Sequence, residues 1–348
     1  MVMAISTVQM LAPDSETTAI ASRMLGIAIK PSMTRISTAS TSLKKPETRP
    51  IASPMTIERI AAPIPITSPL RPRFGFLTST PIIAAATFLL ALIVLISVLA
   101  PLIAPHDPIQ LAPSQRLKPA SAQFLLGTDA YGRDLLSRVI YGGRISLLIG
   151  IGSAILSVAI GLAIGLVSGF FKLVDSVMMR VMDGLMAMPS ILLAIAVVSL
   201  SGASIWTVLV AITIPEIPRV ARLVRSVVLS AREEPYVEAA ISLGSSLPKI
   251  MWRHLVPNTI APLIVQGTYV CASAILTEAI LSFLGAGISP ETPTWGNIMA
   301  EGRQFFQIKP SLIFWPGLLL SIAILSINLI GDAARDALDP RMKQREGK

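Results

Sequence analysis

The chain has 348 residues, of which 53% are hydrophobic and only 14% are charged, and its mean hydropathy is +0.70. An ordinary soluble domain carries about 25% charged residues, so a water-soluble fold of this length could not cover its surface with so few. The composition predicts a polytopic membrane protein and excludes a disordered, collagenous or disulfide-bonded protein for most of the chain. The net charge of +9 is explained as well by basic loops on one side of a membrane as by a nucleic-acid partner.

The first seventy residues differ in composition from the rest of the chain. They contain 9 Ser, 9 Thr and 8 Pro but no Phe, Trp or Tyr. Such a segment cannot bury enough apolar surface to offset its ordering entropy, so residues 1–70 are expected to be disordered. Two interpretations stay open: a flexible cytoplasmic tail, or an over-extended reading frame whose true start lies near Met55 or later.

Six apolar stretches account for the high hydropathy. A helix needs about 20 apolar residues to cross the roughly 30 Å hydrocarbon layer. The uncharged stretch 184–215 exceeds that length, and Ser199–Ser204 within it is typical of a tight turn, so we divide it into two spans. The sequence therefore predicts an all-α polytopic membrane protein with six transmembrane helices, at about 81–103, 145–171, 182–200, 205–226, 257–284 and 311–330.

The distribution of Lys and Arg predicts the orientation of these spans. With the N-terminus inside and residues 1–70 set aside, the inner segments hold 15 Lys and Arg residues and the outer segments hold 7. Loops on the cytoplasmic side carry the excess of basic residues in membrane proteins. Both termini are therefore expected in the cytoplasm.

Small residues recur at every fourth position of the second span. They give one side of the helix a smooth surface that another helix can approach closely. The approaching helix can belong to this chain or to another subunit, and both alternatives stay open. The positions are Ser153, Ser157, Gly161, Gly165 and Gly169.

A cluster of charged residues precedes the second span. Asp129, Arg133, Asp134 and Arg138 have i, i+4 and i, i+5 spacings, which are compatible with ion pairs along one helix. We interpret this segment as a helix lying at the outer face of the membrane.

The longest hydrophilic loop on the inner side runs over residues 227–258. Pro235 suits the first turn of a helix, and Gly244 is a natural stop for its C-terminus. Ser246 can cap a second helix, which Pro257 is expected to end. The loop should therefore form two short helices that join at a glycine and lie across the cytoplasmic face.

The loop resembles a known signature. Glu238-Ala239-Ala240, Gly244, His254 and Pro257 match the EAA motif of bacterial ATP-binding-cassette (ABC) importer permeases. The resemblance extends over roughly residues 73–342 and points to the shorter, C-type subunit of the dipeptide, oligopeptide and nickel permease family. The segments that carry it are Leu126–Asp129, Gly132–Asp134, Ser137–Arg138, Gly142–Leu147, Asp183, Pro189–Ser190, Leu281–Gly285, Pro293, Trp295–Gly296, Gly331–Asp332 and Arg335–Pro340.

The resemblance implies a fold, partners and roles. Residues 71–348 would form a transmembrane permease domain of the type I importer fold in the bacterial inner membrane. Its partners would be a second permease, two ATPase subunits and an external substrate-binding protein. The EAA loop would dock on an ATPase subunit and pass its movement to the membrane helices. Its expected coupling residues are Glu238, Ala239, Ala240, Gly244, His254 and Pro257.

Enzymatic chemistry has little support in the sequence. The phosphate-binding pattern G-x-x-x-x-G-K-[ST] is absent, so ATP would be used by the partner subunits. The two histidines, His106 and His254, lie on opposite sides of the proposed membrane and cannot form one metal site. Cys271 lies in an apolar run, where a buried small side chain is expected. We therefore predict no catalytic, cofactor or metal site in this chain.

Glu278 is the remaining candidate residue, because an intramembrane carboxylate is often functional. Its position near the outer end of the fifth span makes substrate or gate contact one interpretation and a hydrogen-bonded structural role the other. The sequence thus predicts a permease subunit of an ABC importer, with peptides as the expected substrate. The alternative is an ion-coupled secondary transporter, and a membrane-embedded hydrolase lacks a nucleophile and base.

Overall fold

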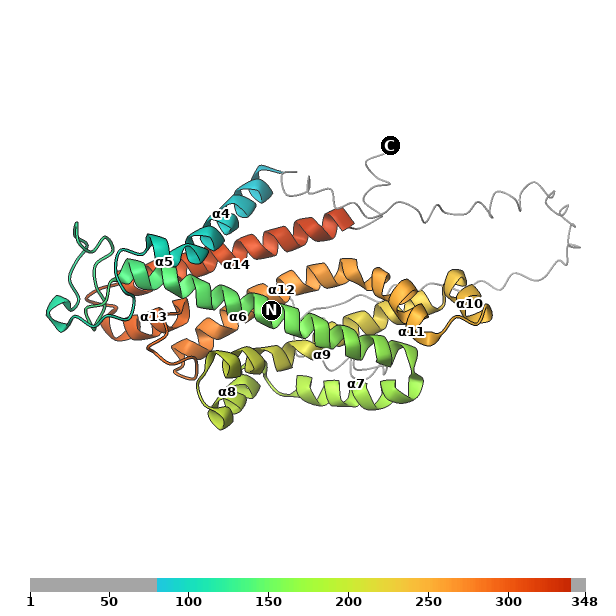
Figure 1. Ribbon diagram of the computed structural model, residues 1–348. Coiled ribbons are helices and arrows are strands. Elements are labelled where there is room, and N and C mark those ends of the chain that lie inside the picture. The colour runs from blue at the N-terminus through green and yellow to red at the C-terminus, as the bar shows by residue number, and fades with distance from the viewer. Residues whose placement is uncertain (1–79, 339–348) are drawn as a thin grey trace, which may run out of the picture. The chain divides into compact units, whose positions relative to one another are not determined.

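The computed structural model describes residues 80–338, and the predicted tail over residues 1–70 lies outside them (Figure 1). All regular structure in the described residues is helical, which confirms the predicted all-α class. The helices in chain order are α4 (Pro81–Val98), α5 (Ala100–Ile103), η2 (Pro113–Gln115), α6 (Leu135–Phe170), α7 (Lys172–Ala187), α8 (Ser190–Ser201), α9 (Ile205–Arg232), α10 (Pro235–Ser242), α11 (Leu247–Ile250), η3 (Met251–Leu255), α12 (Val256–Phe283), α13 (Trp295–Gly302), η4 (Arg303–Phe305) and α14 (Ser311–Leu338).

The helices long and apolar enough to cross a membrane number four in residues 80–338. They are α4, α6, the continuous segment Leu247–Phe283 and α14. The bent pair α7 and α8 makes a fifth if it counts as one span. The predicted number of six is therefore not confirmed. Helix α9 is not among the four; it carries Glu216 near its middle and Arg219, Arg222 and Arg225 in its second half.

The third predicted span, 182–200, does not form one continuous helix. Helix α7 ends at Ala187, α8 begins at Ser190, and the two axes differ by 91°. Met188 between them is extended, with φ −90° and ψ 136°. The cause is Pro189, whose ring disfavours the helical conformation of the preceding residue and whose nitrogen has no hydrogen to donate.

The packing of α6 on α9 organises the centre of the bundle. Ser153, Gly161, Gly165 and Gly169, four of the five small residues predicted on one side of α6, lie against α9, so this contact lies within the chain. A Cβ added to Gly165 would stand 2.5 Å from the carbonyl oxygen of Ala221, and one added to Gly161 or Gly169 would stand 2.6–2.7 Å from a valine side chain of α9. Only residues without a bulky side chain permit this approach.

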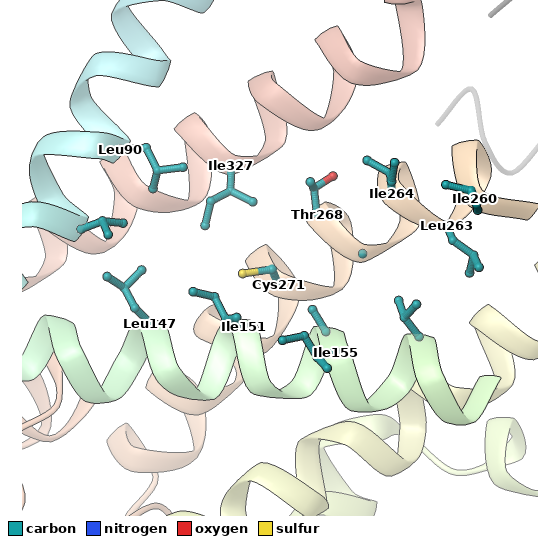
Figure 2. Close-up of a pocket in the computed structure, with 14 residues that line it drawn as sticks. Leu90, Leu147, Ile151, Ile155, Ile260, Leu263, Ile264, Thr268, Cys271 and Ile327 are labelled. Atoms are coloured by element: carbon teal, nitrogen blue, oxygen red, sulfur yellow. The ribbon is translucent and has the colours of Figure 1, made fainter. Parts of the chain in front are cut away.

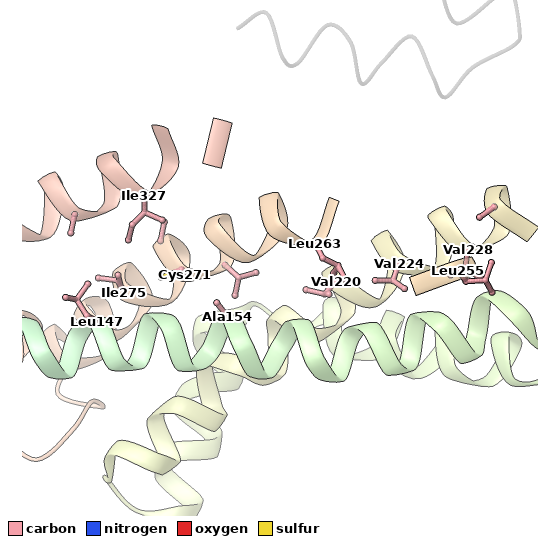
Figure 3. Close-up of a cluster of buried hydrophobic side chains, with 14 of the residues drawn as sticks. Leu147, Ala154, Val220, Val224, Val228, Leu255, Leu263, Cys271, Ile275 and Ile327 are labelled. Atoms are coloured by element: carbon pink, nitrogen blue, oxygen red, sulfur yellow. The ribbon is translucent and has the colours of Figure 1, made fainter. Parts of the chain in front are cut away.

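The direction of α9 follows from the same contacts. Gly161, Gly165 and Gly169 meet Val220, Val224 and Val228 in that order. Figure 3 shows the three valines one after another beside α6. The two helices therefore run parallel, and the chain between them must return across the bundle through α7 and α8. This arrangement favours a crossing by α9 as well, which stays a prediction. Buried apolar side chains of α12 and α14 complete the core beside this contact.

Enlarging Gly165 by a single methyl group should separate α6 from α9. We expect Gly165→Ala to lower the free energy of unfolding by about 1–3 kcal/mol, the usual cost of overpacking a core. The measurement is the thermal unfolding midpoint of the purified protein in detergent.

The matched control is Gly184→Ala in α7, where an added Cβ meets nothing within 4 Å. Alanine favours a helix interior over glycine by about 0.5–1 kcal/mol, so this variant should be as stable as the original or more so. Equal midpoints for the two variants would contradict the close approach of α6 and α9.

Candidate functional site

The EAA loop and the outer charged cluster lie at opposite ends of the helical bundle. Helices α10 and α11 of the loop are at one end, and α13, whose Glu301 pairs with arginines of the cluster, is at the other (Figure 1). Both ends concentrate the polar residues that the long apolar helices exclude.

Helix α10 forms where the EAA motif lies. Pro235 is its first residue, and Glu238 is in its first turn, close to the positive end of the helix dipole. Val237 and Ala240 are buried against the bundle, whereas Glu238 and Ala239 face outward. The motif is therefore divided: Ala240 supports the loop from inside, and Glu238 and Ala239 lie on its free surface.

Gly244 ends α10 in a Schellman motif. The amide of Gly244 donates to the carbonyl of Ile241 at 2.9 Å, and the amide of Ser245 donates to the carbonyl of Ala240 at 3.0 Å. Gly244 has φ +76°, a left-handed conformation that glycine adopts without strain. An added Cβ would meet nothing within 4 Å, so a sharp turn, and not a close contact within this chain, requires glycine here.

The second helix of the loop does not end at Pro257, contrary to the sequence prediction. Helix α11 passes through the π-turn η3 directly into α12, which continues to Phe283. In the π-turn the amide of Val256 donates to the carbonyl of Met251, five residues back. This wider turn accommodates Pro257, which has no amide hydrogen to continue the regular pattern. The loop is thus joined rigidly to a membrane helix.

Polar contacts tie the two halves of the loop together. The side-chain amide of Asn258 donates to the carbonyl of His254 at 2.6 Å and to the hydroxyl of Tyr236 at 2.9 Å. The rings of Tyr236 and His254 have centroids 6.0 Å apart. The contact of His254 with Asn258 is thus made by its main-chain carbonyl.

Two exposed apolar side chains of the loop were not singled out in the sequence. Leu243 is 85% exposed and Trp252 is 75% exposed, whereas Val237, Ile250 and Leu255 are fully buried and anchor the loop. Large apolar side chains that remain exposed beside a polar rim are typical of a protein-binding surface. The sequence feature that could have identified these two residues is the presence of bulky apolar side chains in an otherwise polar loop.

The outer charged cluster forms a turn and not the predicted helix. Helix α6 begins only at Leu135, with Asp134 as its N-cap, accepting from the amide of Ser137 at 2.9 Å. Gly127 and Gly132 both have φ +79°, and Asp129 accepts from two amides of the turn. The spacing suggested a helix because i, i+4 pairs occur there, but the glycines and the Asp129 side chain favour a tight turn.

The charges of this turn are buried and paired. Arg133 Nε lies 2.6 Å from Asp129, and the guanidinium of Arg138, which is fully buried, also contacts Asp129. Glu301 of α13 accepts from both arginines, with Nη atoms at 2.6 Å. Burial would raise the pKa of Asp129, but the two guanidinium groups outweigh it and hold that pKa below its ordinary value.

Lys309 fixes the same turn from another segment. Its ammonium group donates to the carbonyl oxygen of Thr128 at 2.6 Å and to that of Lys118. Burial lowers the pKa of Lys309, while the charge of Asp129 opposes the shift. Glu301 and Lys309 were missed in the sequence because both lie more than 160 residues from their partners.

Glu278 is fully buried within the bundle. Its carboxylate accepts from Ser146 Oγ at 3.2 Å and from Ser282 Oγ at 2.9 Å. Ser146 in turn accepts from the main-chain amide of Trp295 at 3.3 Å, so these contacts join α6, α12 and α13. The geometry favours the structural interpretation over contact with a substrate or gate.

An apolar cleft of about 580 Å³ lies among α4, α6, α12 and α14 (Figure 2). Aliphatic side chains such as Ile151, Ile155 and Ile264 form its wall, and Cys271 points toward it. Among residues 80–338, no charged side chain lines the cleft. Such a wall cannot satisfy a charged or zwitterionic solute, because a polar group that loses water without gaining a partner is destabilised.

The fold and its two polar ends define a polytopic helical membrane protein. The model of the family of binding-protein-dependent transport system inner membrane components matches residues 157–344, more than half of the chain. The chain belongs to this family.

Individual relatives agree with that assignment. A probable peptide ABC transporter permease protein of Sinorhizobium fredii is 52% identical over 239 residues, which cover 69% of this chain and 82% of the relative. A dipeptide transport system permease protein of Alkalihalophilus pseudofirmus is 39% identical and covers 79% of this chain and 91% of its own length. The inward-facing structure of the MetNI methionine ABC transporter aligns with a TM-score of 0.47 and 20% identity, over 59% of this chain and 98% of the matched chain.

Family membership decides the class of transporter. The chain is a multi-pass permease of the inner membrane and belongs to an ABC importer, which confirms the resemblance stated from the sequence. The alternative of an ion-coupled secondary transporter was wrong.

Replacing Asp129 should destabilise the outer end. Asp129→Asn leaves the buried charge of Arg138 without part of its compensation, so we expect a loss of about 3–5 kcal/mol in unfolding free energy. The control is Asp107→Asn, the same change at an exposed residue of the same outer segment. Thermal unfolding in detergent measures both, and equal midpoints would contradict the structural role of the cluster.

The stabilisation by Asp129 also has a defined pH dependence. Because its folded pKa lies below the ordinary value of 3.8, its contribution is fully present above pH 3.8. It is lost as the pH falls below 3.8 through the folded pKa. Acid unfolding of the Asp129→Asn variant should therefore depend less on pH in this range than that of the original protein.

Proposed function

We propose that this chain is the permease subunit through which an ABC importer moves peptides into the cell. The support is the match to relatives named as peptide and dipeptide transport permeases, at up to 52% identity. In this proposal a second permease completes the path, two ATPase subunits hydrolyse ATP, and an external binding protein delivers the peptide. Residues 71–348 form the permease domain, and both termini face the cytoplasm.

The EAA loop couples ATP hydrolysis to the membrane helices. The structure of the loop supports this role, because buried Val237 anchors α10 on the bundle while Leu243 and Trp252 remain exposed. An exposed apolar surface on a short, anchored helix fits a groove on a partner protein. Glu238 on the same free surface can pair with a basic group of the ATPase.

Movement of the loop reaches the membrane through a continuous helix. From Leu247 to Phe283 the chain is helical without interruption, so a displacement at the ATPase is transmitted along α12. ATP binding would draw the two ATPase subunits together, and the loops would follow. The path between the two permeases would then open outward to accept the peptide, and ATP hydrolysis would return it inward.

Uptake by the complete transporter in inverted or reconstituted vesicles tests this function. We expect accumulation of a labelled dipeptide that requires both ATP on the cytoplasmic side and the binding protein on the opposite side. A proton or sodium gradient should not replace ATP. Uptake driven by such a gradient alone, or absence of uptake of any di- or tripeptide in an intact complex, would refute the proposal.

Gly244 should be required for coupling. A side chain without access to the left-handed conformation costs about 1–2 kcal/mol at φ +76°, which shifts the population of this turn about 5–30-fold. Gly244→Leu should therefore reduce peptide uptake by a similar factor while the protein inserts normally and the ATPase subunits remain active.

The matched control is Gly244→Asn, because asparagine tolerates the left-handed conformation and an added Cβ meets nothing within 4 Å. This variant should retain most of the uptake. Normal uptake by Gly244→Leu would count against the coupling role of the turn.

A further inference from the structure

One side of α9 is polar where the helix adjoins the centre of the bundle. Exposed residues recur there at three- and four-residue spacing, which places them on the same side of the helix. We call this side the arginine face, and it consists of Arg219, Arg222, Ser226 and Ser230. The valines that pack against α6 lie on a different side of α9.

The arginine face begins at membrane depth. Val220 packs on Gly161, which lies about 24 Å beyond Ile145 at a rise of 1.5 Å per residue. Ile145 is the first residue of an uncharged stretch of α6 that extends to Phe171. Arg219, next to Val220, therefore lies within a hydrocarbon layer about 30 Å thick, in its inner half.

The acidic partners of these arginines leave the positive charges exposed. Arg219 Nη1 lies 3.1 Å from Glu216, whose side chain is only 7% exposed and also accepts from Ser273 Oγ at 3.3 Å. The side chain of Arg219 is 44% exposed. The carboxylate is thus held inside the bundle, while the guanidinium group is presented outward.

Arg222 and Arg225 are paired with α7 in different ways. Arg222 contacts Asp183 through one nitrogen, and both side chains are exposed, by 43% and 62%. Arg225 contacts both oxygens of Asp175, a bidentate pair. A single contact between exposed side chains is weak, so Arg222 can exchange its partner more readily than Arg225.

Charged side chains at this depth do not face lipid tails; they face other helices or a water-filled path. The core of a packed interface between subunits is also depleted in charged residues. The face continues toward the cytoplasm into a cavity of about 480 Å³ bounded by Ser226, Ser230, Glu234, Tyr236 and Asn258. An aqueous route along α9 therefore accounts for both the charges and the cavity.

We propose that the arginine face lines the inner half of the transport path and receives the carboxylate end of the peptide. This inference rests on the proposed function as a peptide importer. A guanidinium group binds a carboxylate through two parallel hydrogen bonds, and every peptide with a free C-terminus carries such a group. The peptide carboxylate would replace Asp183 beside Arg222 and then leave toward the cavity at the EAA loop.

Cysteine modification in the complete transporter tests whether the arginine face is open to water and attracts anions, and the test requires no known substrate. The Ser226→Cys and Ser230→Cys variants are treated in vesicles with an anionic and, separately, with a cationic methanethiosulfonate reagent. The rate at which each reagent modifies the cysteine is divided by the rate at which the same reagent reacts with free 2-mercaptoethanol. The protein without these substitutions supplies the background from buried Cys271. We expect both positions to react, with about a tenfold preference for the anionic reagent.

Charge variants on the Ser226→Cys background identify the residues responsible. Arg222→Gln should reduce the anionic preference several-fold, and Asp183→Asn should increase it, because it removes the competing carboxylate. Arg225→Gln is the matched control on the same helix and should change the preference less than twofold. A free dipeptide at high concentration should slow the anionic reagent, whereas its C-terminal amide should not.

The outcomes separate this inference from the proposed function. If the complete transporter imports peptides but Ser226→Cys is unreactive, the face is covered by the partner permease or by lipid and the inference is wrong. Equal preference for both reagents, or protection by the amide as strong as by the free acid, would also overturn it. If no peptide is imported although the anionic preference and its arginine dependence are present, the proposed substrate fails while the basic path remains.

Discussion

The close approach of α6 and α9 is the constraint on which the rest of the structure depends. Gly161, Gly165 and Gly169 bring the two helices together because a larger side chain would overlap the main chain or the valines of α9. Parallel helices at this distance force the intervening chain to return through α7 and α8. The same contact also fixes which side of α9 is buried and which carries Arg219 and Arg222. Packing between small residues thus decides on which side of α9 its charged residues can lie.

The two ends of the bundle differ in how their charges are used. At the outer end Asp129, Arg133, Arg138 and Glu301 pair with one another, and these side chains are at most 16% exposed. A buried network of this kind is costly to break, because each lost partner leaves an uncompensated charge. Toward the inner end, Arg222 and Asp183 are paired through one contact and remain exposed. The outer end is therefore built to keep one arrangement, and the inner end is able to exchange partners.

The sequence predicted those features that depend on local pattern. Apolar length located the helices, Pro235 and Gly244 set the ends of α10, and the four-residue repeat of small residues located the side of α6 that meets another helix. Three expectations failed for identifiable reasons. Pro189 bends the third predicted span, the π-turn carries the second loop helix past Pro257, and paired glycines turn the Asp129 segment where its spacing suggested a helix. In each case the local pattern fitted more than one backbone conformation, and contacts with the surrounding helices decided between them.

Contacts between segments that are far apart in the sequence could not be predicted from local sequence patterns. Glu301 completes the outer cluster, and Lys309 reaches the carbonyl of Thr128, from segments that are close only in the folded chain. The same applies to Arg222 and Asp183, which are 39 residues apart in the sequence and meet because α7 packs beside α9. The chain reverses at extended Phe171 between α6 and α7, and the returning α7 carries Asp183 to the exposed Arg222. The turn between α6 and α7, together with the helices that carry the two side chains, thus sets the charge beside Arg222 on the proposed path.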